Sequence, residues 1–204
     1  MPKPRLAEVH RKTSETSVEL RLILDAARDH GCSGRHQANI STCCGFFDHM
    51  LRLLAFHAQF SLDLHATGDI EVDYHHLVED VGICIGEAFC EALGDKQGIT
   101  RFGSALVPMD DALSMAVVDL SGRPFLHFNV PMPCAKVGDF DTELVEEFMR
   151  ALASNGKFTL HVDLLHGWNT HHIIESVFKA VALALRQAAA AGDTSSIPST
   201  KGVL

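Results

Sequence analysis

Apolar positions along the chain follow two spacings, and these spacings predict alternating strands and helices. In residues 47–57, Met50, Leu51 and Leu54 recur at helical spacing, which predicts an α-helix. Two longer helices are predicted to begin near 75 and near 171, with Gly94 closing the first. Alternation of apolar and polar residues predicts strands at 17–24, 61–64, 113–120 and 159–162. Stretches containing Gly or Pro are predicted to be two loops and a non-helical tail, at 26–37, 131–139 and 192–202.

The chain also repeats itself. The segment HHLVE at 75–79 reappears as HHIIE at 171–175, which is 96 positions later (171 − 75). Upstream, residues 48–64 match 146–162 at an offset of 98 (147 − 49), so one gap of two residues relates the halves. We interpret this match as an internal duplication, with strands and two helices in each half.

The predicted fold class is therefore α/β (α+β). It is an internally duplicated two-layer unit of sheet plus helices, with the two halves packed side by side. We expect a single domain over 1–204, made of repeats at about 5–96 and 97–192, with a C-terminal substrate-binding tail at 193–204.

Composition narrows the class of protein. The 204 residues are 47% hydrophobic and 21% charged, which is enough apolar content for a core and argues against disorder. The formal net charge of −9 argues against nucleic acid or an anionic membrane as the partner. No apolar run is long enough for a membrane span and no secretory signal is evident, so we expect a cytoplasmic protein. The six cysteines contain no CxxC pair and are expected to stay reduced.

Thirteen histidines are the unusual part of the composition, and they fall beside acidic residues. On a helix, residues four apart share a face, whereas adjacent residues point about 100° apart. His75 and Glu79 can therefore bind one ion together, while His76 points toward another. Because the second cluster repeats this arrangement, the two clusters predict two metal ions. A single HxxE pair is usually a solvated helix face, but a duplicated HHxxE favours metal binding.

The duplication adds one further pair of candidate ligands. His49 lies in an Asp-His pair near the start of its predicted helix, and its repeat partner is Glu147. Imidazole and carboxylate ligands together suit six-coordinate manganese or iron(II) better than a four-coordinate structural zinc. A zinc peptidase is disfavoured because the chain has no H-E-x-x-H motif.

Seven segments, covering almost the whole chain, resemble the imidazoleglycerol-phosphate dehydratase family. They are GFFDHML (45–51), ATGDIEVDYHHLVEDVGICIGEA (66–88), ALGDKQGITRFG (92–103), PMDDAL (108–113), VDLSGRP (118–124), THHIIESVFKA (170–180) and IPSTKGVL (197–204). The resemblance implies a duplicated α/β fold and a homo-oligomer of 24 subunits with active sites between subunits. It implies a hydro-lyase of histidine biosynthesis, which converts imidazoleglycerol phosphate to imidazole-acetol phosphate.

The resemblance also implies the ligands of two Mn²⁺ ions. The first ion is assigned to His49, His76, His171 and Glu175. The second ion is assigned to His75, Glu79, Glu147 and His172. In this division the histidine and glutamate that are four residues apart bind the same ion, and the second histidine of each cluster binds the other ion. This agrees with the helix-face argument.

Substrate-binding residues follow from the same resemblance. Glu15 matches an acid that contacts the substrate, and His49 and His57 fall within the matching substrate region; for His57, direct contact and a supporting role both stay open. Guanidinium forks and a hydroxyl-bearing loop suit a phosphate ester. The expected phosphate-binding residues are Arg101, Arg123, Lys179, Ser199, Thr200 and Lys201.

Four residues depart from the family pattern. Cys43 and Cys44 stand where Gly-Ile is common, Tyr74 where a small or acidic residue is common, and Trp168 where an acidic or polar residue is frequent. These departures spare the expected ligands and are expected to alter only the edge of the pocket.

A mechanism can be hypothesised for the implied dehydration. Two ions on the two ring nitrogens favour the imidazolate, which expels the neighbouring hydroxyl. A carboxylate then removes a carbon-bound proton, and the resulting enol becomes a ketone. Glu15, Glu79 and Glu175 are the candidate catalytic carboxylates, and the sequence leaves the choice among them open. Two alternatives also stay open: a dinuclear hydrolase, with ions about 3.5–4 Å apart, and a shell protein that uses metal only to join subunits.

Overall fold

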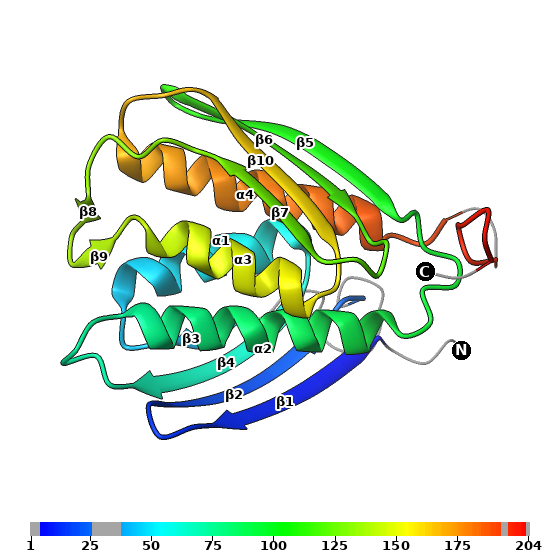
Figure 1. Ribbon diagram of the computed structural model, residues 1–204, viewed down its shortest axis with the longest axis horizontal. Helices are drawn as coiled ribbons and strands as arrows, with labels where there is room; N and C mark the ends of the chain where they lie inside the picture. Colours follow the sequence, from blue (N-terminus) through cyan, green and yellow to red (C-terminus); the bar gives the residue numbers. More distant parts are fainter. Residues whose placement is uncertain (1–4, 26–37, 193–195, 203–204) are drawn as a thin grey trace.

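Two four-stranded sheets enclose the helices of this chain (Figure 1). The structure is a computed structural model, and it describes residues 5–25, 38–192 and 196–202. The first sheet contains β1 (Leu6–Lys12), β2 (Thr16–Ile23), β3 (Ala38–Ser41) and β4 (Ser61–Gly68). The second contains β5 (Phe102–Met109), β6 (Ala112–Asp119), β7 (Phe125–Asn129) and β10 (Thr159–His166). A short hairpin joins β8 (Lys136–Val137) to β9 (Phe140–Asp141).

The two sheets have the same topology. Their strand orders are β1-β2-β4-β3 and β5-β6-β10-β7. In each sheet the last strand in this order pairs in parallel with its neighbour, and the other pairs are antiparallel. Leu20 pairs with Leu64 in the first sheet, and Ala116 pairs with Val162 in the second. The predicted duplicated α/β architecture is therefore confirmed, while the repeat boundaries stay a prediction.

The four helices of the described residues lie between the sheets (Figure 1). They are α1 (Gly45–Ala58), α2 (His75–Leu93), α3 (Leu144–Asn155) and α4 (Thr170–Ala189). Helix α2 packs on the first sheet and against α3, and α4 packs on the second sheet and against α1. Each HHxxE helix therefore contacts a helix from the other half of the chain.

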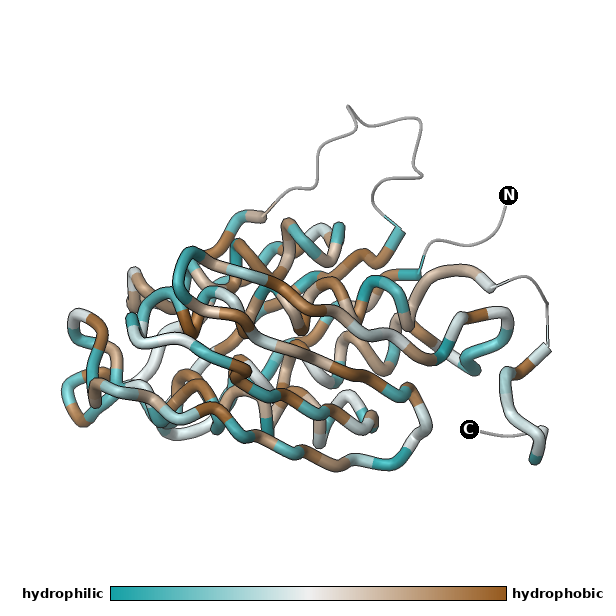
Figure 2. The backbone as a smooth tube through the Cα atoms, turned by 90° about the horizontal axis from the view of Figure 1, so that it is seen from above, coloured by the Kyte–Doolittle hydropathy of each residue, from teal (hydrophilic) through white to brown (hydrophobic). Residues whose placement is uncertain are grey.

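One continuous core fills the space between the sheets. Its largest fully buried side chains include Phe47, Phe89, Phe148, Phe158 and Phe178, which come from both halves. Apolar and polar positions alternate along the same elements (Figure 2), because each strand or helix buries one face. The halves are therefore joined by burial of shared apolar surface, which is the main favourable contribution to folding.

The predicted elements can now be compared with the structure. The helix at 47–57, the helices at the two clusters and all four predicted strands are confirmed, each extending to the bounds above. The predicted loop at 131–139 is wrong in part, because it contains the short strand β8, which pairs with β9 directly after the loop. The loop predicted at 26–37 lies outside the described residues, and the described part of the tail contains no helix. Among the described helices, none is long and apolar enough to cross a bilayer.

Candidate active site

The second HHxxE cluster forms the first turns of α4. Asn169 caps this helix, and its side-chain oxygen accepts hydrogen bonds from the backbone N–H of His171 and of His172 at 3.0 and 3.3 Å. At the first cluster, an Asp73 carboxylate oxygen accepts from the backbone N–H of His75 at 2.7 Å. In both clusters a side-chain oxygen therefore accepts from the backbone N–H of the first histidine, and at α4 this oxygen belongs to the N-cap residue.

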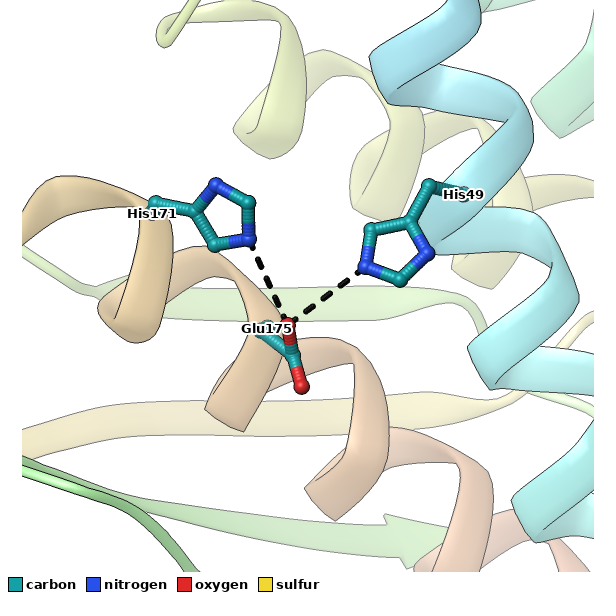
Figure 3. Close-up of side chains that lie close together, drawn as sticks. All are labelled: His49, His171 and Glu175. Atoms are coloured by element: carbon teal, nitrogen blue, oxygen red, sulfur yellow. Dashed lines mark ion pairs between the residues drawn. The ribbon is translucent and has the colours of Figure 1, made fainter.

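Three predicted metal ligands converge from two helices (Figure 3). The Nε2 atom of His49, on α1, lies 3.5 Å from Oε2 of Glu175, on α4. The Nε2 atom of His171 lies 3.4 Å from the same oxygen. One potential ligand atom from each residue falls within 4.8 Å of the other two. His171 and Glu175, which are four residues apart, lie on one face of α4 and both reach this group, while their binding of one ion stays a prediction.

Glu175 is the buried member of the group. Its side chain is 9% exposed, whereas those of His49 and His171 are nearly half exposed. Lys179, one turn further along α4, places its Nζ atom 2.6 Å from Glu175 Oε1. Burial alone would raise the pKa of Glu175, but hydrogen bonds from Lys179 and His49 and their charges outweigh it and lower the pKa. The carboxylate is therefore held ionised and oriented toward the two imidazoles.

These donors fit a divalent metal. Two imidazole nitrogens and a carboxylate oxygen are a common mixed ligand set for first-row divalent ions. The group is open to solvent on the histidine side, so further ligands can reach it. His76, the fourth residue expected at the first ion, does not join this group within the described chain.

The first cluster is less closely assembled. His75 and Glu79 on α2 and Glu147 on α3 do not form a comparable group of ligand atoms among the described residues. The helices that carry these residues, α2 and α3, nevertheless pack against each other. In α2, Ile83 occupies the place that corresponds to Lys179 in α4 (179 − 83 = 96).

The adjacent histidines, His76 and His172, point to other partners. His76 Nδ1 lies 3.0 Å from Asp69 Oδ2, and His172 Nδ1 lies 2.6 Å from Asp111 Oδ1. Asp69 and Asp111 were not singled out from the sequence. The signal that could have found them is their place within the ATGD and PMDDAL segments. Asp111 also accepts bonds from the backbone N–H groups of Asn169 and Trp168, and these bonds, with His172, lower its pKa.

Glu15 lies in the turn between β1 and β2, at the rim of an open cleft of about 300 Å³. Its side chain is half exposed, and its Oε2 atom lies 3.9 Å from Nδ1 of His76. Asp69 and Thr13 line the same cleft. The structure thus places Glu15 beside an expected ligand and accessible to a small molecule.

Two of the expected phosphate-binding residues, Arg101 and Arg123, lie beside Asp119. Arg101 Nε lies 2.8 Å from Asp119 Oδ1, and Arg123 Nη2 lies 4.0 Å from Asp119 Oδ2. A second nitrogen of Arg101 donates to the backbone oxygen of Pro198 at 2.8 Å, which ties the C-terminal tail to this position. Ser199, Thr200 and Lys201 follow directly in that tail, in which Ser199 Oγ accepts from the backbone N–H of Lys201 at 3.2 Å.

Lys179 and His57 lie at the Glu175 group rather than beside Asp119. Lys179 pairs with Glu175, as described above. His57, near the end of α1, is half-buried, and burial followed by the charge of Lys179 lowers its pKa. Both residues border the three converging ligands, so each can act on a substrate or on Glu175.

The departures from the family pattern lie around the helix starts. Cys43 adopts a positive φ of 63° just before α1, and Tyr74 immediately precedes α2 and packs against the core. Trp168 is 75% exposed just before α4, and its backbone N–H donates to Asp111 at 2.8 Å. The five described cysteines form no disulfide with one another.

Comparisons with known proteins agree over the length of the chain. The sequence model of one family, imidazoleglycerol-phosphate dehydratase, matches residues 42–185. The chain belongs to this family. An imidazoleglycerol-phosphate dehydratase of Desulforudis audaxviator is 55% identical over 98% of both chains, and that of Pelotomaculum thermopropionicum is 56% identical over the same shares.

Solved structures of the imidazoleglycerol-phosphate dehydratase family share the fold. The Staphylococcus aureus enzyme has a TM-score of 0.80 and 41% identity, covering 91% of this chain and 99% of that chain. The Pyrococcus furiosus enzyme, solved in complex with (S)-C348, has a TM-score of 0.80 and 36% identity, covering 96% and 100%. The predictions of the family, of a hydro-lyase and of the fold class are confirmed.

Proposed function

We propose that this chain catalyses the metal-dependent dehydration of imidazoleglycerol phosphate to imidazole-acetol phosphate, in histidine biosynthesis. The observation that carries the proposal is the convergence of His49, His171 and Glu175 from opposite halves of the chain. An HxxE pair on a solvated helix face would need neither a lysine beside its carboxylate nor a histidine from another helix, and Glu175 has both. Family membership supplies the reaction and substrate class.

The ligand sets proposed are those implied by the resemblance, for two Mn²⁺ ions per active site. The first ion is held by His49, His76, His171 and Glu175, and the second by His75, Glu79, Glu147 and His172. Since His76 does not reach the His49 group in its own chain, it would serve the site of another subunit. This arrangement supports the proposal of active sites between subunits.

Glu15 is the carboxylate best placed to move the proton. When bound, the two ions supply Lewis acidity that favours the imidazolate form of the substrate ring. Glu175 is occupied by Lys179 and two imidazoles, and its lowered pKa makes it a weak proton acceptor. Glu79 is proposed as a ligand of the second ion. Glu15 is exposed beside His76 and free to accept the carbon-bound proton of a substrate held there.

The phosphate is proposed to bind where Arg101 and Arg123 approach the tail. Asp119 orients Arg101, and the bond to Pro198 brings Ser199, Thr200 and Lys201 near the same guanidinium. Guanidinium and hydroxyl donors together suit a phosphate ester. Lys179 and His57 are proposed to contact the substrate from the metal side.

Assembly into 24 subunits is proposed as well. The outer face of the second sheet exposes large apolar side chains, among them Phe102, Leu106 and Phe125, which are each more than half exposed. Contiguous exposed apolar surface is typical of subunit contacts. The cytoplasmic location stays a prediction.

Removal and replacement of metal test the function directly. The purified protein is treated with a chelator, and Mn²⁺, Zn²⁺ and Mg²⁺ are added back separately while dehydration of imidazoleglycerol phosphate is measured. We expect activity to be lost with the metal and restored best by Mn²⁺. Full activity after verified metal removal would reject metal dependence. Release of inorganic phosphate instead would indicate a hydrolase, and metal-dependent assembly without turnover would indicate a shell protein.

Glu15→Gln separates the proton carrier from the ligands. Because the amide cannot accept the proton, turnover should fall by about 10²–10⁴-fold, while Mn²⁺ content per chain stays that of the wild-type protein. Glu19→Gln, on the exposed face of β2, is the control. Unchanged turnover in Glu15→Gln would remove Glu15 from the mechanism.

A further inference from the structure

In each half of the chain, the second histidine of the HHxxE cluster forms a hydrogen bond with a carboxylate that is not an expected metal ligand. In the second half, His172 Nδ1 and Asp111 Oδ1 are 2.6 Å apart. In the first half, His76 Nδ1 and Asp69 Oδ2 are 3.0 Å apart. The two carboxylates come from different loops, Asp111 from the β5–β6 turn and Asp69 from the segment after β4. In both halves the hydrogen bond is therefore formed by Nδ1 of the imidazole, although the carboxylates occupy different places in the fold.

Asp111 is itself held in place. Its side chain is only 8% exposed, and its second oxygen accepts hydrogen bonds from the backbone N–H of Trp168 at 2.8 Å and of Asn169 at 3.0 Å. These bonds connect the β5–β6 turn to the first turn of α4. Asp111 thus has little freedom to turn away from His172, and it fixes the imidazole relative to the helix that carries it.

The bonds decide which ring nitrogen can bind a cation. A carboxylate only accepts hydrogen bonds, so Nδ1 of each imidazole carries the proton. The lone pair of the neutral ring is then on Nε2, which is the atom left for a metal. Nε2 of His172 lies 3.6 Å from Oδ2 of Asp110, whose side chain is 72% exposed.

We infer that Asp111 and Asp69 are positioning residues, which hold His172 and His76 in the Nδ1–H form with Nε2 presented to a divalent ion. Carboxylates behind metal-bound histidines fix ring orientation and raise ligand basicity, and their loss lowers metal affinity about 10–100-fold. The inference rests on the proposed function for the assignment of His76 and His172 to different ions. It adds two residues, one for each ion.

The test measures metal binding, not activity. Asp111→Asn, Asp69→Asn and the wild-type protein are stripped of metal and dialysed to equilibrium against increasing free Mn²⁺, and bound Mn²⁺ per chain is measured. Each variant should lose affinity for one ion of the two, by about 10–100-fold, and keep the other. The matched control is Asp63→Asn, since Asp63 also accepts a 3.0 Å bond but lies on an exposed strand face.

Conservative variants distinguish positioning from folding. Asp111→Glu and Asp69→Glu keep the carboxylate and should recover affinity relative to the Asn variants. Metal-free thermal unfolding of all variants shows whether a variant is folded. If folded Asn variants bind both ions as the wild-type protein does, or if Asn and Glu variants lose affinity equally, the inference is wrong. A wild-type protein that binds two Mn²⁺ ions without dehydrating the substrate would reject the proposed function alone.

Discussion

The two halves of this molecule have the same sheet order and the same HHxxE spacing, yet they are stabilised differently. In the first half, α2 is joined to the sheet by a charged group: Asp80 accepts from Arg11 Nε at 2.9 Å and from the hydroxyl of Thr16. In the second half, the corresponding residue of α4 is Ser176 (176 − 80 = 96), whose hydroxyl lies 2.6 Å from that of Ser114. The HHxxE spacing is therefore the same in the two halves, whereas the hydrogen bonds between helix and sheet differ.

The helix contacts differ in the same way. Gly82 and Gly86 let α2 approach α3 closely, since a Cβ atom on Gly86 would lie 2.7 Å from the backbone oxygen of Leu152. The corresponding residues of α4 are Phe178 and Ala182, which are both buried, and the ring of Phe178 stacks on that of Phe148 of α3 with centroids 5.4 Å apart. The two helices therefore share the HHxxE residues and buried apolar positions such as Val81 and Val177, but they differ where α2 meets α3.

The β-turns diverged as well. Glu15 lies in the β1–β2 turn and Asp111 in the β5–β6 turn, which are equivalent in the two sheets. Asp111 forms a hydrogen bond with Nδ1 of His172. In the first half, Asp69 forms the hydrogen bond with Nδ1 of His76, and Oε2 of Glu15 lies 3.9 Å from the same nitrogen. The turn carboxylate therefore contacts the histidine in the second half, whereas in the first half it stays half exposed.

The largest difference in stability is expected from the charged group. Asp80→Ala removes a 9% exposed carboxylate from Arg11 and Thr16, and should cost about 2–3 kcal/mol, the usual range for bonds to charged groups. Ser176→Ala, its counterpart, should cost about 1 kcal/mol. Urea unfolding of the metal-free proteins measures both free energies. Equal losses would mean that the halves are not stabilised differently at this position.

A smaller effect is expected from the close helix contact. Gly86→Ala adds a methyl group against the backbone of α3 and should cost about 1–2 kcal/mol, because overpacking exceeds the gain in helix propensity. Glu87→Ala, at the next and exposed position, should change stability by less than about 0.5 kcal/mol. Thermal unfolding compares the two. A stabilised Gly86→Ala protein would contradict the close approach of α2 and α3.

The smallest effects are expected at the helix starts. Asn169→Ala removes the side-chain cap of α4 and should cost about 1 kcal/mol, since its oxygen accepts from two backbone N–H groups. Asp73→Ala removes a single bond at α2 and should cost about 0.5 kcal/mol. Unfolding free energies of the metal-free proteins give the order, and a larger loss for Asp73→Ala would reverse the comparison.

Much of the fold could be predicted because its signals are local. Period-two and helical spacings marked β2, β4, β6, β10 and the longer helices. The edge strands β1, β3, β5 and β7 and the short hairpin of β8 and β9 were missed, since each is stabilised by pairing along one side with residues outside itself. Of the site, the four clustered histidines and Glu175 were found from spacing, but Asp69 and Asp111 were missed because each belongs to a loop without periodicity.

The amino-acid order alone determines that His171 and Glu175 share a helix face, because four residues make about one turn. It also contains the duplication, from which two similar sheets follow. Only the tertiary structure decides that His49 of the first half meets the cluster of the second, since this requires α1 to pack against α4. The physical reason is burial: each HHxxE helix covers its own sheet and completes its core with a helix from the other half.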